Sequence, residues 1–211
     1  MSQKIRYTSE NFGPFLFKSS LPKELIDELL TSGNECKESA NHTLAGHLKN
    51  QYLYSRKFQE NFYIKFLPFL KAYRDGHCNY HNLNNSVQIE MRPVDLWINF
   101  MEPGDFNPLH THTYDLSFVT YLSVPQEINI ENKEYKGSSA GPGSISFNFT
   151  QSANPKWATT ERHYLPKTGD LFIFPALLQH WVAPFKSNVT RISVSGNIAF
   201  SNKSEFPAGY F

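Results

Sequence analysis

From residue 87 onward the chain consists of short runs of β-branched and aromatic residues separated by Pro, Gly and Asn. Such runs, with a turn every roughly eight to twelve residues, are typical of antiparallel strands in a sandwich or barrel. We predict strands at 87–92, 94–101, 116–124, 127–136, 144–150, 158–164, 170–174, 179–184 and 190–199. The pattern therefore favours a mainly β fold, a jelly roll or double-stranded β-helix with a cupin-like barrel.

The N-terminal part follows another pattern, and we expect it to supply helices that pack on the barrel. Residues 12–19 should be extended, and a helix should open at Ser20, which can act as its cap, and stop near Gly33. A second helix is predicted over about residues 56–75, where Pro68 should kink or divide it.

The length of 211 residues fits one domain over 1–211, because barrels and sandwiches often reach this size undivided. Within it we expect a helical support over about 1–86, the β core over 87–200 and a C-terminal tail over 201–211. Hydrophobic residues make up 40% of the chain and aromatic residues 15%, which is enough for one large core.

Charge and hydropathy argue against several classes of partner. A net charge of +1 without a basic block gives no electrostatic reason to expect nucleic acid or an anionic membrane as a partner. No apolar run is long enough to span a membrane, and the first residues lack the apolar region of a signal peptide. We therefore expect a cytoplasmic protein, in the host cytoplasm if a phage encodes it, with Cys36 and Cys78 as free thiols. A homo-oligomer is compatible with the sequence but is not indicated by it.

Three histidines stand where the ends of different strands should meet. His110 and His112 follow a turn-rich stretch, and alternation along a strand would place both rings on one side. His180 follows Pro175 at the start of another strand. Neutral imidazoles that converge and leave a coordination position open suit a transition metal such as iron. We predict His110 and His180 as metal ligands and catalytic residues.

The third ligand is open on the sequence alone. His112 is the first candidate, but the same residue could lie beside the metal or donate to a substrate. Asp115 is the nearby downstream carboxylate, although a residue at the start of a strand is more often solvated. Water could also complete the site.

Residues 190–195 alternate between polar and apolar, which places Arg191, Ser193 and Ser195 on one face of a strand. Arg191 offers a permanently charged fork that suits a carboxylate, and Ser193 beside it can add a hydroxyl contact. An ordinary half-exposed strand has the same pattern, so it is the position eleven residues after His180 that gives it weight.

The spacing His110-x-His112 … His180 … Arg191-x-Ser193 resembles that of the 2-oxoglutarate and Fe(II)-dependent oxygenases. Their double-stranded β-helix carries His-x-Asp/Glu … His for iron and Arg-x-Ser for the cosubstrate. The stretches Asn99–His112, Gly169–Pro175 and Arg191–Asn197 resemble more closely a small family of such oxygenases, found in bacteria and marine phages. The resemblance covers about residues 94–200.

The resemblance implies that His110 and His180 bind iron, that Arg191 binds the distal carboxylate of 2-oxoglutarate and that Ser193 assists it. It implies Fe(II), 2-oxoglutarate and O2 as cofactor and cosubstrates. The chain departs from the family pattern at one point, since His112 stands where the family has a carboxylate. Aspartyl/asparaginyl β-hydroxylases, which are similar in this segment, also lack that carboxylate.

A second resemblance competes with the first. The stretches around the His pair and around His180 also match the spacing of the two cupin motifs, but the usual cupin Glu is missing, Leu177 replaces a Gly and Pro184 replaces an Asn. Arg191-x-Ser193 favours the oxygenase. The alternatives are a cupin-type metal-dependent dioxygenase and a metal-binding module without activity.

The substrate is the least determined part. Related oxygenases hydroxylate prolyl, asparaginyl or other peptide side chains, or act on small metabolites; we expect a peptide or protein side chain. Tyr121 and Asn99 are candidate hydrogen-bond donors to the cosubstrate, and Trp181 is the candidate substrate contact because it adjoins His180. Loops 102–109 and 137–157 should flank the mouth, the second as a mobile lid that orders with substrate.

Overall fold

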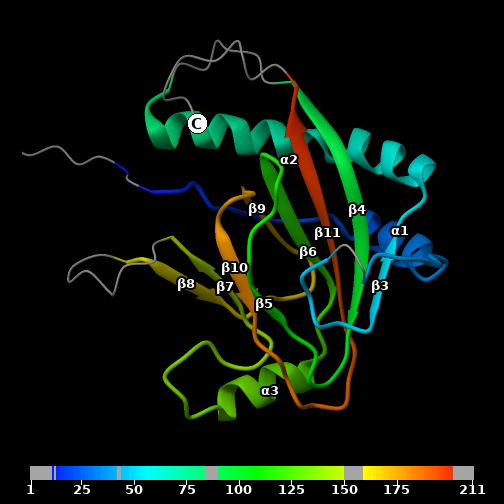
Figure 1. The fold of residues 1–211 in the computed structure, drawn as a ribbon, viewed down its shortest axis with the longest axis vertical. Helices are drawn as coiled ribbons and strands as arrows, with labels where there is room; N and C mark the ends of the chain where they lie inside the picture. Colours follow the sequence, from blue (N-terminus) through cyan, green and yellow to red (C-terminus); the bar gives the residue numbers. More distant parts are fainter. Residues whose placement is uncertain (1–10, 12, 42–43, 84–89, 150–158, 202–211) are drawn as a thin grey trace, which may run out of the picture.

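The structure, a computed structural model, describes residues 11, 13–41, 44–83, 90–149 and 159–201. Two antiparallel sheets form the body of the protein (Figure 1). The seven-stranded major sheet has the order β1 (Phe17–Ser20), β9 (Asp170–Pro175), β6 (Leu116–Ser123), β11 (Arg191–Phe200), β4 (Met91–Met101), β3 (Asn50–Leu53) and β2 (Glu38–Ser39). The four-stranded minor sheet has the order β5 (Asn107–His110), β10 (Gln179–Val182), β7 (Ile145–Asn148) and β8 (Glu161–Tyr164). The mainly β fold is as predicted.

Alternation along the strands of the major sheet divides the core in two. One set of side chains, which includes Val194 and Ile198 of β11, packs with the helices, as the cluster with Leu29, Phe62 and Phe66 shows. The other set packs between the two sheets; it comprises Val119, Tyr121, Phe172 and Phe174 of the major sheet and Ile145, Phe147 and Val182 of the minor sheet. Because both faces of the major sheet are covered, β6 is buried along nearly its whole length.

Two helices cover the outer face of the major sheet, as the sequence predicts, but their ends differ. Helix α1 is Lys23–Gly33; it begins after Pro22, whereas Ser20, the expected cap, lies in β1. Helix α2 is Arg56–His81, longer than predicted, and Pro68 does not divide it. Buried aromatic side chains on both sides of Pro68 pack against the sheet and stabilise the helix through the proline.

The N-terminal part also contributes strands: β1 overlaps the stretch predicted as extended, whereas β2 and β3 were not predicted. β1 pairs with β9, so that Phe17 lies opposite Ile173. β3 pairs with β4, so that Gln51 lies opposite Asn99. Both edges of the major sheet therefore come from this part of the chain.

The strand predicted at 127–136 is wrong, because residues Gln126–Glu134 form helix α3. Ile128 and Ile130 alternate as strand residues would, but only Ile128 is buried and the residues around them are charged or polar helix formers. The strands predicted at 87–92 and 94–101 fall on one strand, β4, which begins at Met91; residues 87–89 of the first prediction lie outside the described residues.

Other expectations lie partly outside the described residues as well: residue 158 of a predicted strand, residues 150–157 of the predicted lid and the tail after Ser201. Within the described part, no helix is both long and apolar enough to span a membrane.

Candidate metal centre and the cavity beside it

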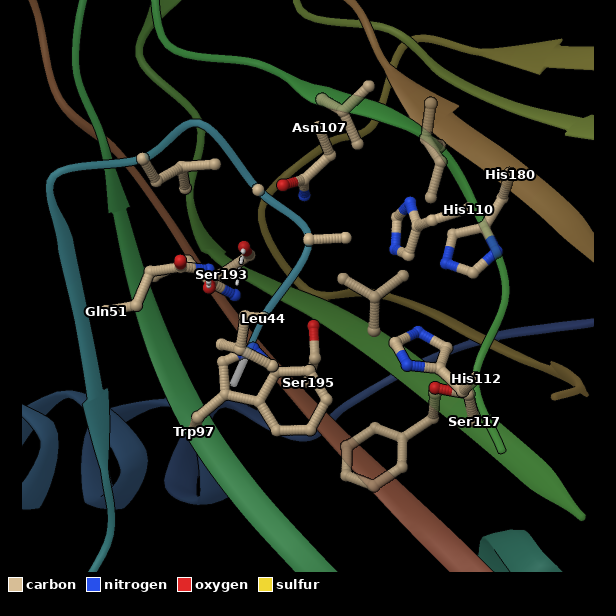
Figure 2. Close-up of a pocket in the computed structure, with 18 of the residues that line it drawn as sticks. Leu44, Gln51, Trp97, Asn107, His110, His112, Ser117, His180, Ser193 and Ser195 are labelled. Carbon is tan, nitrogen blue, oxygen red and sulfur yellow. Dashed lines mark hydrogen bonds between the residues drawn. The ribbon is translucent and has the colours of Figure 1, made fainter. Parts of the chain in front are cut away.

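Three histidine rings converge at the point where β5 and β10 pair. In this pairing His180 lies opposite His110, and His112 follows two residues after β5. The ring centroids of His110 and His180 are 4.2 Å apart, those of His112 and His180 5.1 Å, and those of His110 and His112 5.2 Å. One ring nitrogen of each residue lies within 4.8 Å of the others (Figure 2). The structure thus brings together the three residues predicted as metal ligands.

Backbone carbonyls orient two of the rings. His110 Nδ1 lies 2.7 Å from the Pro108 carbonyl oxygen, and His180 Nδ1 lies 2.8 Å from the Leu178 carbonyl oxygen. A carbonyl can only accept, so each Nδ1 must carry a proton and donate it. Each ring therefore keeps the lone pair of Nε2 for a metal, in the arrangement by which proteins fix a histidine ligand.

Burial keeps these rings neutral. It lowers the pKa of His110, and it lowers the pKa of His112 to about 4, with the nearby His110 as a second cause. It also lowers the pKa of His180 well below its ordinary value, with the neighbouring His110 and His112 as further causes. Only a neutral imidazole binds a metal, so the centre is prepared for one over the whole neutral range.

This burial predicts an acid limit to stability. Since the folded pKa values lie below the ordinary 6.5, the unfolded chain takes up protons first as the pH falls. We expect the free energy of unfolding of the metal-free protein to decrease as the pH falls from about 6.5 towards 4, and His112→Gln to flatten this decrease. Chemical denaturation between pH 7.5 and 4.5 tests this; equal slopes for the two proteins would contradict it.

The donor set fits a metal without a carboxylate ligand. Among the described residues, His110, His112 and His180 form the group of His, Cys, Asp or Glu side chains that lie close enough together to hold a metal ion. Asp115, the alternative third ligand, lies elsewhere: its carboxylate accepts from the backbone N–H of Phe200 at 2.8 Å, and it lines a groove beside α2. Three neutral nitrogens suit iron and other divalent first-row metals and leave the full ionic charge to attract anionic ligands.

A cavity extends from the histidines along the inner face of the major sheet (Figure 2). Arg191 lines it and is 3% exposed. Its Nη1 donates to the Gly143 carbonyl at 2.7 Å, its Nη2 contacts Met101 Sδ at 2.8 Å, and its Nε has no partner. Burial lowers its pKa, while the nearby Tyr121 raises it. Among the described residues no carboxylate pairs with it, so this cation lacks the anion that burial normally demands.

Three polar side chains adjoin Arg191 because of strand register. Ser193 lies opposite Asn99 of β4 on one side and Tyr121 of β6 on the other. Asn99 Nδ2 donates to Ser193 Oγ at 3.4 Å, which leaves the Ser193 hydroxyl hydrogen for a ligand. Burial raises the pKa of Tyr121 to about 12, so this phenol remains a neutral donor. All four residues predicted to bind a cosubstrate thus line the same cavity as the histidines.

The structure adds residues that the sequence did not indicate. Gln51 of β3 is 2% exposed, lines the cavity and donates to Asn99 Oδ1 at 2.8 Å. Trp97 also lines it, with its ring 6.1 Å from that of His112. In Figure 2 the segment that carries Leu44 passes over the cavity. Neither the polarity nor the spacing of these residues distinguishes them from ordinary core or loop residues in the sequence.

The prediction for Trp181 is wrong as to place. Trp181 follows His180 in β10, and successive side chains of a strand point to opposite faces. It lies 6.5 Å from the ring of His163 and is not among the residues lining the cavity. Of the predicted flanking loops, 102–109 contributes Asn107 to the lining and 137–157 contributes Ile145. Gly143 of the second loop accepts a hydrogen bond from Arg191.

Comparison with known proteins bears on this site. Residues 95–197 match the family described as "Putative 2OG-Fe(II) oxygenase". A search of curated proteins found no matching sequence. Among solved structures, a prolyl-4-hydroxylase of Pseudomonas putida is 16% identical with a TM-score of 0.55, over 87% of this chain and 91% of that one.

Two further structures share the fold. The viral collagen prolyl hydroxylase of Paramecium bursaria Chlorella virus-1, in complex with 2-oxoglutarate, is 16% identical with a TM-score of 0.53, over 87% of this chain and 94% of that one. HygX of Streptomyces hygroscopicus, with nickel, 2-oxoglutarate and hygromycin B bound, is 8% identical with a TM-score of 0.58, over 91% and 84%. At these identities the likeness establishes the double-stranded β-helix fold.

The matched segment contains the three histidines, Arg191 and Ser193, and the fold around them is the one that these oxygenases share. Over residues 95–197 the chain is therefore similar to the 2OG-Fe(II) oxygenases, enzymes that use Fe(II), 2-oxoglutarate and O2.

Proposed function

We propose that the protein hydroxylates a peptide or protein side chain of the prolyl or asparaginyl kind, coupled to the decarboxylation of 2-oxoglutarate to succinate. The observation that carries the site assignment is one cavity that joins three neutral histidines to a buried arginine without an anion. His110, His112 and His180 would hold the metal. When bound, the metal would activate O2; 2-oxoglutarate would supply two electrons as it loses CO2 and becomes succinate with one of the oxygen atoms, and the substrate C–H bond would supply the other two and take the second oxygen atom as a hydroxyl.

The residues of the chain have separate tasks in this reaction. Arg191 neutralises the distal carboxylate, and Ser193 and Tyr121 donate to it, because all three present N–H or O–H groups to an acceptor-only dianion. The apolar walls, which include Val119 and Phe174, exclude water from the reacting atoms. Since the guanidinium is already fixed by the Gly143 carbonyl, little ordering remains when the cosubstrate binds.

A peptide substrate is supported by the segment Leu44–Leu48 over the cavity. His47 in this segment forms a β-bridge to Phe106: its N–H donates to the Phe106 carbonyl at 2.8 Å, and the two rings stack 4.7 Å apart. The segment thus places extended backbone beside β5 at the mouth, a surface on which another extended chain can bind through main-chain hydrogen bonds. Two of the structures with this fold are prolyl hydroxylases, whereas HygX is bound to hygromycin B, a small molecule.

The substrate class is tested with Fe(II)-loaded protein, 2-oxoglutarate and O2. We expect peptides from a proteome-derived library to gain about 16 Da, one oxygen atom, with succinate formed in step. The His180→Ala protein, incubated in the same way, should give neither product. Oxidation of a panel of small metabolites with no peptide modified would replace the peptide proposal. If no succinate forms under any condition, the interpretations that remain are a metal-binding module without activity and a cupin-type dioxygenase.

A further inference from the structure

We propose that helix α3 fixes the position of Arg191 and thereby sets the chain length of the 2-oxo acid that the enzyme accepts. The inference rests on the proposed binding of the cosubstrate by Arg191. Helix α3 lies at the end of the barrel where β11 begins, opposite α2 (Figure 1). Its hydrogen bonds reach the turn around Gly143 and the loop before β11, so its influence on the reaction would pass through the arginine.

The first link is the carbonyl that holds the guanidinium. Arg191 Nη1 donates to the Gly143 carbonyl at 2.7 Å. Gly143 has a φ of +73°, a conformation that residues with a side chain rarely adopt. A Cβ at this position would lie 2.4 Å from Cγ2 of Ile128, which is fully buried in α3. The turn that offers the carbonyl is therefore packed directly on the helix.

The second link is a pair of hydrogen bonds on both sides of that carbonyl. Asn132 of α3 donates through Nδ2 to the Pro142 carbonyl at 2.8 Å and to Ser144 Oγ at 3.2 Å. These residues immediately precede and follow Gly143. The backbone carbonyl of Ser144 in turn accepts from Ala183 at 2.9 Å, which joins the turn to the segment after β10. One amide thus determines where the Gly143 oxygen points.

The third link holds the segment that leads into β11. Glu131, the residue before Asn132, accepts from the N–H of Lys186 at 2.9 Å and from the N–H of Ser187 at 2.8 Å. It also accepts from the Ser187 hydroxyl at 2.6 Å. Two adjacent residues of α3 therefore hold the turn that contacts the guanidinium and the loop four residues before Arg191. The exposed Lys133, which follows them, makes neither contact and is a matched control.

Because the histidines and Arg191 are both held in fixed positions, the site can discriminate between diacids of different chain length. The histidines stand on β5, β10 and the loop after β5, and Arg191 stands at the start of β11, so a diacid must span the distance between two rigid elements. One methylene too many or too few in such a site costs about 10- to 200-fold in selectivity. A guanidinium that can shift would accept both the longer and the shorter diacid. Loss of α3 support should thus relax the length preference and not merely weaken binding.

The test compares Asn132→Asp, which keeps the shape and loses both donors, with Lys133→Ala. Dissociation constants for 2-oxoglutarate, the shorter oxaloacetate and the longer 2-oxoadipate are measured on anaerobic Fe(II) protein by calorimetry. We expect Asn132→Asp to weaken 2-oxoglutarate binding about 10- to 100-fold, the usual effect of a residue that supports a ligand-binding group. In Asn132→Asp the preference for 2-oxoglutarate over 2-oxoadipate should fall, while its affinity for Fe(II) stays that of the wild type. Lys133→Ala should bind all three acids as the wild type does.

Selectivity separates a positioning role from a structural one. If Asn132→Asp weakens all three acids in parallel, or changes none, the inference is overturned; Asn132→Ala provides the same comparison without a new charge. An Arg191→Met protein that binds 2-oxoglutarate normally would overturn the cosubstrate assignment and this inference with it. Loss of binding in Arg191→Met with unchanged selectivity in Asn132→Asp overturns the inference alone.

Discussion

Replacing either His110 or His180 by alanine should abolish Fe(II) binding and all turnover. These rings lie opposite each other in the β5–β10 pairing, and each has its Nδ1 proton engaged by a backbone carbonyl, so each can offer the lone pair of its Nε2 to the metal. Anaerobically purified wild-type protein should bind about one Fe(II) per chain through this centre. Metal analysis after dialysis measures the stoichiometry, and the variants should retain none.

His163→Ala is the matched control, because this histidine bonds to Ser146 in the minor sheet and does not line the cavity. His112→Ala decides the third ligand: a loss equal to that of His110→Ala means three-histidine ligation, whereas near-normal iron content places His112 beside the metal. Full iron content in both the His110→Ala and His180→Ala proteins would refute the assignment of the centre.

Arg191→Met should strongly weaken 2-oxoglutarate binding and yet leave the cosubstrate-free protein as stable as the wild type or more stable. The wild-type cation is buried without a paired carboxylate among the described residues. A hydrophobic side chain of similar length removes that desolvation cost. Loss of one partner of a desolvated charge pair weakens binding by about 2–5 kcal/mol.

Thermal unfolding with and without 2-oxoglutarate measures both effects at once. We expect the cosubstrate to raise the Tm of the Fe(II) wild-type protein and to leave that of Arg191→Met unchanged, since only a bound ligand stabilises the folded state. The visible charge-transfer band of the anaerobic Fe(II)–2-oxoglutarate complex should disappear in the variant. Absence of the band in the wild-type protein, together with binding that is indifferent to Arg191, would favour the cupin-type interpretation.

Sequence periodicity was sufficient for most of the strands because their buried faces impose it. It failed for α3, where Ile128 and Ile130 alternate although only one of them is buried. In so short a helix one buried side chain carries the packing, and a period of 3.6 residues cannot emerge. The strand β3 was missed for a related reason: it is short, and it pairs with β4, which lies far away in the chain.

The candidate site was predictable where chemistry depends on residue type, and unpredictable where it depends on register. Histidines and an arginine stand out at any position, but Gln51 enters the cavity only because β3 sets it opposite Asn99. Trp181 was a different error. Strand alternation already requires it to point away from His180, so nearness in sequence was the wrong criterion.

The pairing of β1 with β9 has a consequence for how the chain folds. Phe17 contacts its neighbour on the sheet, Ile173, only after most of the chain lies between them. Pairings of this kind raise the contact order and slow the search for the native state. On the ribosome, β1 emerges long before β9 exists, and the partly made chain must hold an unpaired strand until then. The last step of folding would be the closing of this sheet edge, and slow refolding with early aggregation is its kinetic signature.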